Sequence, residues 1–261
     1  MSKQLEPLRR PNIYSPARCI QSPFQHCSPR RPPLLRTCRL KYLFGNQARE
    51  MQVKIPRTFG FYAILTDPVV GYERMTELLV EKDVAFVQLR MKDRPRGEIE
   101  RTARSMRRIT AGSATRLIIN DYPAIAAEIG ADGVHVGQDD MPYEQARTIV
   151  GNQAVVGIST HSPEQTGAAC SLGPDYIGIG PVFPTTTKKI PDSPLGVHGM
   201  REMLTAATVP AVVLGSLDAS NLPSVLQAGA RNFSLVRPLN RSENPRAVLE
   251  EILAIYRENV A

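Results

Sequence analysis

The chain has 261 residues, 42% of them hydrophobic and 22% charged, and a formal charge of +7 at pH 7. This length is enough for one large domain or two small ones with a sizeable core. No run of about 18 apolar residues occurs, which excludes a helix that spans a membrane.

Residues 1–50 differ in composition from the rest of the chain. They hold ten of the 32 Lys and Arg and two of the 25 Asp and Glu, which leaves 22 basic and 23 acidic residues in 51–261. The body of the chain is therefore not basic. A nucleic-acid role would rest on residues 1–50 alone and lacks stacking aromatics or a recognisable module, so we expect none. The first segment also carries seven of the 22 prolines without a sustained apolar period, which predicts a disordered extension.

Two interpretations of this basic, Pro-rich extension stay open. Its many arginines and few acids suit a transit peptide, although its prolines would interrupt an amphipathic helix. The alternative is a start assigned too far upstream, with the protein beginning at Met51. Cys19, Cys27 and Cys38 lack the paired spacing of a zinc site. Cys170 stands alone in the body, as in reduced cytosolic proteins. We expect a cytoplasmic protein, or an organellar one if the extension is a transit peptide, and leave the oligomeric state open, a homo-oligomer included.

From Met51 onward, short β-rich runs alternate with segments of helical spacing. The predicted strands are 62–67, 84–91, 116–121, 133–137, 155–160, 176–182, 211–215 and 232–237, and the predicted helices lie near 71–82, 96–111, 122–130, 142–150, 162–172, 197–207, 219–228 and 244–258. Gly130 and Gly173 stand at helix ends, and Ser162-Pro163 is typical of a helix start. Eight strands, each followed by a helix, favour a (β/α)8 TIM barrel over residues 51–261; a doubly wound open sheet is the competing arrangement.

The second predicted strand carries polar side chains on one face. Gln88, Arg90 and Lys92 alternate with three apolar residues, so a period of two directs the polar set to one face of the strand. In a barrel the apolar set faces the helices, and the amide, guanidinium and ammonium groups point towards the barrel mouth. Two cations there are unfavourable unless an anion binds beside them.

Acidic residues follow the third and fourth predicted strands. Asp121 comes directly after Asn120, and Asp140 lies shortly after the fourth strand. Carboxylates at the ends of adjacent parallel strands can converge on one Mg²⁺, with water completing its shell. For either acid taken alone, the N-cap of the next helix is the alternative interpretation.

The loop after the sixth predicted strand adds hydroxyl and ammonium groups. Thr185, Thr187 and Lys188 can donate hydrogen bonds to an anion, whereas a solvated loop is the alternative interpretation of such residues. Cations on two sides of the barrel mouth, with acids between them that can hold a metal, predict a binding site for a diphosphate.

Five motifs together resemble one known family. They are QLRMK at 88–92, ND at 120–121, GADGVHVGQDD at 130–140, GISTH at 157–161 and DYIGIGPVFPTTTKK at 175–189. As a set, in this order, they are similar to the thiamine phosphate synthase family over nearly all of 60–258. The resemblance implies a barrel that joins a hydroxymethylpyrimidine diphosphate to a thiazole phosphate, giving thiamine phosphate and pyrophosphate.

The resemblance also implies roles for individual residues. Those implied to hold the pyrimidine diphosphate are Gln88, Arg90, Lys92 and Asn120. Those implied to bind Mg²⁺ are Asp121 and Asp140, and those implied to contact the diphosphate or the thiazole are Ser159, Thr185, Thr187 and Lys188. We take Lys188, Arg90 and Lys92 as the catalytic residues of a dissociative reaction, in which pyrophosphate leaves before the thiazole nitrogen attacks. Because that reaction needs no general base, His135 is expected to be a hydrogen-bonded core residue, and His161, after a strand end, could instead touch the substrate.

The chain departs from the family pattern at the last two strands. After the predicted seventh strand, Gly215-Ser216 stands where the family has two glycines; after the predicted eighth strand, whose last residue is Arg237, Arg237-Pro238 stands where the family has Ser and a small residue. Arg237 could clamp the thiazole phosphate, fill its pocket or point outwards to solvent. Two other functions stay open: a thiazole tautomerase, which generally lacks the motifs around Arg90 and Lys188, and a non-catalytic barrel that binds thiamine precursors.

Overall fold

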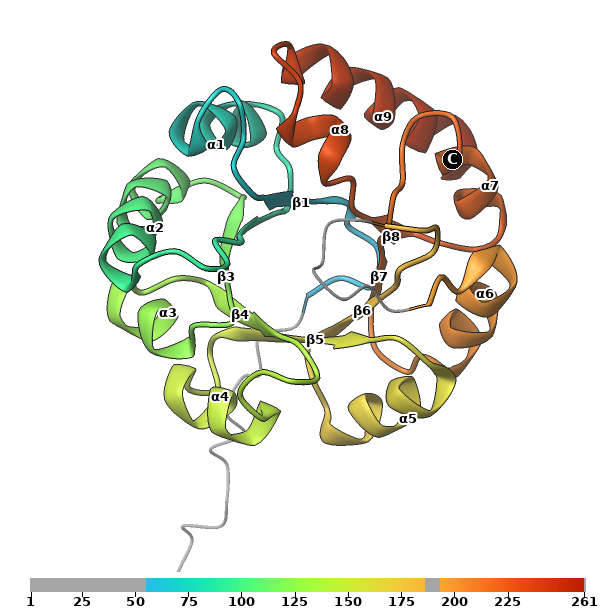
Figure 1. Ribbon diagram of the computed structural model, residues 1–261, viewed down its shortest axis with the longest axis horizontal. Helices are drawn as coiled ribbons and strands as arrows, with labels where there is room; N and C mark the ends of the chain where they lie inside the picture. The colour runs from blue at the N-terminus through green and yellow to red at the C-terminus, as the bar shows by residue number, and fades with distance from the viewer. Residues whose placement is uncertain (1–54, 186–192, 261) are drawn as a thin grey trace, which may run out of the picture. The chain divides into compact units, whose positions relative to one another are not determined.

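The computed structural model describes residues 55–185 and 193–260. Within them, eight parallel strands follow one another around a closed barrel in chain order, and β8 pairs with β1. Helices surround the ring of strands (Figure 1). The predicted (β/α)8 barrel is therefore confirmed and the open sheet is excluded. The predicted extension at residues 1–50 lies outside the described residues.

The elements follow the predicted alternation. The strands are β1 (Gly60–Leu65), β2 (Phe86–Leu89), β3 (Arg116–Asn120), β4 (Gly133–Val136), β5 (Val155–Thr160), β6 (Tyr176–Ile179), β7 (Ala211–Val213) and β8 (Asn232–Phe233). The helices are α1 (Tyr72–Glu81), α2 (Arg96–Thr110), α3 (Pro123–Ile129), α4 (Tyr143–Val150), α5 (Pro163–Leu172), α6 (Gly196–Ala206), α7 (Leu222–Gln227), α8 (Arg237–Asn240) and α9 (Pro245–Val260). In the part of the chain that the structure describes, none of these helices is long and apolar enough to cross a bilayer.

Helix ends are set by the residues predicted to set them. Ser162 accepts a hydrogen bond from the Gln165 N–H at the start of α5, and Pro163 occupies its first turn. Gly130 and Gly173 end α3 and α5 in the left-handed conformation that glycine adopts without steric penalty.

The end of the barrel differs from the predicted pattern. Strand β8 has two residues, and Arg237-Pro238 opens the four-residue helix α8. Proline lacks a backbone N–H and fixes φ near the helical value, so it suits the first turn of a helix and cannot donate to a strand ladder. The prediction that residues up to Arg237 continue the strand is therefore wrong, and strand parity does not set the direction of the Arg237 side chain.

The core has two layers separated by the sheet. Val87, Leu89 and other outward residues pack against the helices, whereas Tyr62, Phe86 and Tyr176 pack against one another inside the barrel. Because side chains alternate along a strand, residues at even positions of β2 share the inward face of Phe86. The predicted inward direction of the polar residues of β2 follows from this packing.

Two buried asparagines reinforce the seam between the last strand and the first. The side-chain oxygen of Asn232, Oδ1, accepts hydrogen bonds from the backbone N–H groups of Phe59 and Gly60. The Asn240 side chain accepts one from the Thr66 N–H at the other end of β1. The β1–β8 ladder itself has two residue pairs, so side-chain amides provide much of the hydrogen bonding that closes the barrel.

Candidate active site

Strand β2 brings two cations to the carboxyl end of the barrel. The Arg90 N–H donates to the Leu65 carbonyl at 2.9 Å, which extends the β1–β2 pairing by one residue and fixes the Arg90 backbone. Burial lowers the pKa of the Arg90 guanidinium, and the negative charges of Asp121 and Asp140 oppose that shift. Arg90 therefore lies in the electrostatic field of two acids that follow β3 and β4.

The two acids are hydrogen-bonded to each other and to neighbouring groups. Burial, and after it the hydrogen bond with Asp140, raises the pKa of Asp121 to about 6, against the effect of Lys92. Lys92 Nζ lies 3.0 Å from Asp121 Oδ2. Burial acts to raise the pKa of Asp140 as well, but hydrogen bonds from Asp121 and the Gly137 N–H outweigh it and hold that pKa below its usual value. At low pH the two carboxyls can therefore hold one proton between them.

Neither acid caps a helix. The N-cap residues of α3 and α4 are Tyr122 and Pro142, and neither helix has a side-chain cap. Asp121 takes a left-handed φ of 64°, and Asp140 Oδ2 accepts the Gly137 N–H at 2.8 Å. The alternative that these aspartates serve as N-caps is therefore wrong.

The acid pair fits a hard divalent cation by its donor set. Two carboxylates whose ionisation is coupled provide the oxygen ligands that Mg²⁺ prefers, and a cation would relieve their repulsion. Within residues 55–185 and 193–260, no cluster of three or more His, Cys, Asp or Glu is arranged to hold a metal. Among these described residues, no third side chain of these four types joins Asp121 and Asp140 in such a cluster.

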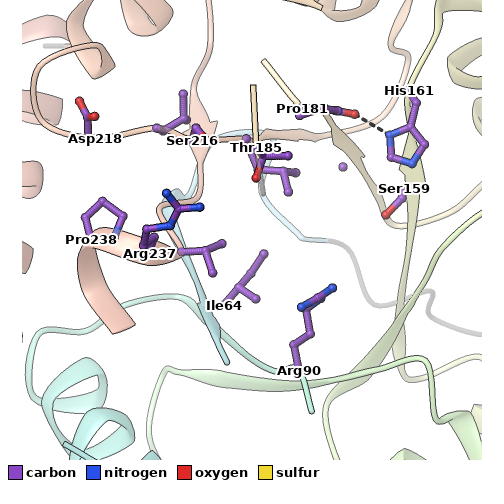
Figure 2. Close-up of a pocket in the computed structure, with 16 residues that line it drawn as sticks. Ile64, Arg90, Ser159, His161, Pro181, Thr185, Ser216, Asp218, Arg237 and Pro238 are labelled. Carbon is purple, nitrogen blue, oxygen red and sulfur yellow. Dashed lines mark hydrogen bonds between the residues drawn. The ribbon is translucent and has the colours of Figure 1, made fainter. Parts of the chain in front are cut away.

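Arg90 also lines a cavity of about 200 Å³ at this end of the barrel. Figure 2 shows Arg90 and Arg237 reaching into it from β2 and α8, with Ser159 and His161 to one side and Ser216 to another. Arg237 thus lines the cavity while its side chain stays exposed to solvent. The ring of His161 is oriented by a hydrogen bond between Nδ1 and the Gly180 carbonyl.

An apolar wall of the cavity was not predicted from the sequence. It includes Ile64, Leu214 and Val236, which come from β1 and from the segments that follow β7 and β8. Their inward parity was available as a signal, but a lone apolar residue at a strand end does not distinguish a cavity wall from ordinary core. The cavity thus combines cationic groups with a surface on which a flat ring can pack.

Gly215 and Ser216 shape the turn after β7. Gly215 has a φ of 114°, and a Cβ there would lie 2.4 Å from the Pro181 Cα, so only glycine fits. Ser216 has a φ of 50°, and its hydroxyl donates to the Pro184 carbonyl at 2.6 Å. The side chain that stands in place of the family's second glycine is therefore bonded to the loop after β6.

The remaining predicted residues fall into three groups. Thr185 lines the cavity. Thr187 and Lys188 lie outside the described residues. Gln88 and Asn120 are buried within the barrel, at 2% and 6% exposure, and the Gln88 amide donates to the Tyr62 hydroxyl at 3.1 Å.

Comparison with known proteins identifies similar sequences over most of this barrel. The family model described as thiamine monophosphate synthase matches residues 62–239. A thiamine-phosphate synthase of Pelotomaculum thermopropionicum is 34% identical over 177 residues, which are 68% of this chain and 81% of that protein. One of Neisseria meningitidis is 36% identical over 197 residues, 75% of this chain and 94% of that protein.

Solved structures agree with the sequence comparison. A thiamine phosphate pyrophosphorylase from Pyrococcus furiosus superposes with a TM-score of 0.72 and 27% identity, over 78% of this chain and 99% of that one. A 3-hexulose-6-phosphate synthase at 16% identity has a TM-score of 0.57, which reflects the shared barrel alone.

Proposed function

The chain belongs to the thiamine monophosphate synthase family, and its function is thiamine phosphate synthesis, a transferase reaction; we propose how the residues of this barrel carry it out. The substrates are 4-amino-2-methyl-5-(diphosphooxymethyl)pyrimidine and 4-methyl-5-(2-phosphooxyethyl)thiazole. The bond between the pyrimidine methylene carbon and the diphosphate oxygen breaks, and its electron pair leaves with pyrophosphate. The thiazole nitrogen then donates its lone pair to the methylene carbon, which gives thiamine phosphate.

One observation carries this proposal: Arg90, Lys92, Asp121 and Asp140 converge at one mouth of the barrel. The negative charges of both acids act to raise the pKa of Arg90. Lys92 forms an ion pair with Asp121. A diphosphate bound here would accept hydrogen bonds from both cations, and Lys92 would exchange its carboxylate partner for a phosphate oxygen. Groups fixed before the reaction stabilise the charge that builds on the leaving group without reorganising.

Asp121 and Asp140 are the residues that would hold Mg²⁺ in this proposal. When bound, the ion supplies positive charge to the departing pyrophosphate. Both acids must be ionised to bind it, and the neighbouring Lys92 favours the ionised form of Asp121. Lys188, a proposed third cation of the site, falls in the undescribed part of the loop.

The thiazole phosphate is assigned to the half of the cavity lined by Ser216 and Arg237. Arg237 is the cation on that side of the cavity, and a guanidinium can bind a phosphate through two parallel hydrogen bonds. The apolar wall formed by Leu214 and Val236 offers a surface for the thiazole ring. Binding both rings in one cavity brings the nucleophile to the reacting carbon, which lowers the entropic part of the barrier.

The test is an assay of the purified full-length chain with both precursors and Mg²⁺. We expect thiamine phosphate and pyrophosphate to form in equal amounts, and EDTA to abolish both. Arg90→Ala should reduce the rate by at least about 100-fold, since it removes a charged group from the leaving-group site. Arg101→Ala, which removes an exposed arginine of α2, is the matched control and should leave the rate unchanged.

The same assay distinguishes the two alternative functions. Isomerisation of the thiazole ring without condensation would identify a tautomerase, and binding of both precursors without turnover would identify a non-catalytic barrel. Either result would contradict the proposed reaction.

We place the catalytic unit in residues 51–261 and the protein in the cytoplasm, with a transit peptide in residues 1–50 as the alternative. Mass spectrometry of the N-terminus of protein isolated from its native cells tests this placement. Sedimentation of the same material would report whether it is a homo-oligomer.

A further inference from the structure

A chain of hydrogen bonds crosses the inside of the barrel and ends at the cavity. The Gln88 amide nitrogen lies 3.1 Å from the Tyr62 hydroxyl, which lies 2.7 Å from the Tyr176 hydroxyl. That hydroxyl lies 3.0 Å from His135 Nδ1, and His135 Nε2 lies 2.9 Å from Ser159 Oγ. Four of the five members are buried, and Ser159 lines the cavity. The catalytic scheme above makes no use of the other four members.

The internal members of this chain face only amide, hydroxyl and imidazole groups within it. Burial raises the pKa of the Tyr62 and Tyr176 phenols, so both keep their hydrogens. The two ring nitrogens of His135 face hydroxyl groups, Nδ1 that of Tyr176 and Nε2 that of Ser159. A neutral imidazole between them carries one hydrogen, on Nδ1 or on Nε2, and its neighbours decide which.

The direction of each bond follows from the first one. The Gln88 NH₂ group can only donate, so the Tyr62 oxygen accepts, and the Tyr176 oxygen is the remaining acceptor in this chain for the buried Tyr62 hydrogen. Tyr176 accepts that hydrogen bond and donates its own hydrogen to His135 Nδ1. The remaining His135 hydrogen is then on Nε2 and is donated to Ser159 Oγ. Because Ser159 already accepts, its own hydrogen is available to a ligand in the cavity.

We propose that Gln88 acts as a positioning residue that fixes the direction of this buried hydrogen-bond chain, so that Ser159 presents a donor to the cavity. The ligand group that it recognises is an acceptor without hydrogens, such as a phosphate oxygen. The identity of the ligand rests on the proposed function, whereas the direction of the hydrogen-bond chain does not. The reverse direction, with the Gln88 oxygen accepting from Tyr62, would place the histidine hydrogen on Nδ1 and turn the Ser159 hydrogen towards His135.

The tautomer of His135 is the direct test. In the full-length protein labelled with ¹⁵N-histidine and free of substrates, long-range ¹H–¹⁵N correlation spectra distinguish a hydrogen on Nε2 from one on Nδ1. The chain has four histidines, and loss of one signal set in His135→Gln assigns the relevant one. We expect the Nε2–H tautomer; the Nδ1–H tautomer or an imidazolium at pH 7.5 would overturn the proposal. The tautomer is measured without substrates, so its result does not depend on whether the chain makes thiamine phosphate.

Two variants test whether the direction is set by Gln88 and passed on by Tyr176. Gln88→Glu keeps the shape but replaces the donor with an acceptor, and at pH 9 we expect His135 to change to the Nδ1–H tautomer. Gln145→Glu, the same change at an exposed position of α4, is the matched control and should change nothing. Tyr176→Phe should give a mixture of tautomers. An unchanged single Nε2–H tautomer in Gln88→Glu or in Tyr176→Phe would refute the transmission.

Binding of pyrophosphate tests the consequence for the ligand. Measured by calorimetry with Mg²⁺, its affinity should fall about 10-fold or more in Ser159→Ala, because a hydrogen bond to a charged group is lost. Ser171→Ala, which removes a hydroxyl from the exposed side of α5, should bind as the parent does. Equal affinity of Ser159→Ala and the parent would show that Ser159 donates nothing to the anion.

Discussion

The ammonium of Lys92 lies 3.0 Å from Asp121 Oδ2, so a cation that follows β2 and an acid that follows β3 already neutralise each other at the barrel mouth. This ion pair holds the side chains of Lys92 and Asp121 in position in the ligand-free protein. A bound diphosphate and its metal ion would divide the pair, since each partner then gains a counter-ion of its own. The site is thus preorganised by mutual compensation of the charges it needs.

Asp121 should make stability depend on pH between about 4 and 6. Its folded pKa of about 6 exceeds the ordinary value of 3.8, so the folded state binds more protons than the unfolded chain in that window, and this contribution falls as pH rises through it. Asp121→Asn removes the dependence. In EDTA, by calorimetry, we expect the melting temperature of the parent minus that of the variant to be higher at pH 4.5 than at pH 7.5. Asp139→Asn, in an exposed neighbour, is the control, and a difference that stays constant or rises would contradict the assignment.

Removal of Arg237 should affect one substrate and not the other. In Arg237→Ala we expect the KM for the thiazole phosphate to rise roughly 10-fold, since a charged hydrogen-bonding partner is lost, with the KM for the pyrimidine diphosphate within about twofold. Arg241→Ala, in an exposed residue after α8, controls for lost charge. Steady-state kinetics with each substrate varied in turn measure both constants. A lower KM for the thiazole phosphate would mean instead that Arg237 obstructs the pocket.

Gly157 should tolerate no side chain. A Cβ there would lie 2.2 Å from the Tyr176 ring, in the packed interior of the barrel. Gly157→Ala is expected to destabilise the fold by about 1–3 kcal/mol, because the ring must shift. Gly167→Ala, where a Cβ meets no atom within 4 Å inside α5, should stabilise it by about 0.5–1 kcal/mol. Urea unfolding of both variants gives the comparison, and two effects of the same sign would contradict it.

Ser216 should show the balance between backbone strain and one hydrogen bond. Ser216→Ala keeps the left-handed φ and loses the bond to the Pro184 carbonyl, so we expect a loss of about 1 kcal/mol. Ser216→Gly loses the same bond but relieves the strain, and should restore most of that loss. The free energies of unfolding of the two variants test this order. Equal values would show that the backbone conformation carries no penalty.

Most of the fold could be predicted because its pattern is repeated and local. The eight alternations of strand and helix follow from side-chain period alone, and so does the parity of Arg90 and Lys92, which continues that of β2. The convergence of Asp121 and Asp140 followed from parallel strands ending at one mouth. Each of these inferences needs only neighbours in the chain and the topology.

Other features depended on contacts that no local pattern contains. The hydrogen bond between Tyr62 and Tyr176 joins residues 114 positions apart. From the sequence, an aromatic residue in a strand is equally well explained as an ordinary core residue. Arg237 was assigned to a strand because Phe233 and Leu235 alternate before it, whereas Pro238 begins a helix there. The resemblance placed Gln88 at the substrate, and its burial next to Tyr62 gives it a second role that the motif does not express.

Strand β8 pairs with each of its neighbours, β1 and β7, through two residue pairs, and this short pairing affects how the molecule loses activity on heating. The segment attached by the fewest main-chain bonds exchanges its amide hydrogens first, and it does so by local opening before the whole domain unfolds. Val236 and Arg237 lie three and four residues after the end of β8. Thermal inactivation should therefore begin as a loss of thiazole phosphate affinity, while the pyrimidine half of the cavity, supported by β2 and β3, is still intact.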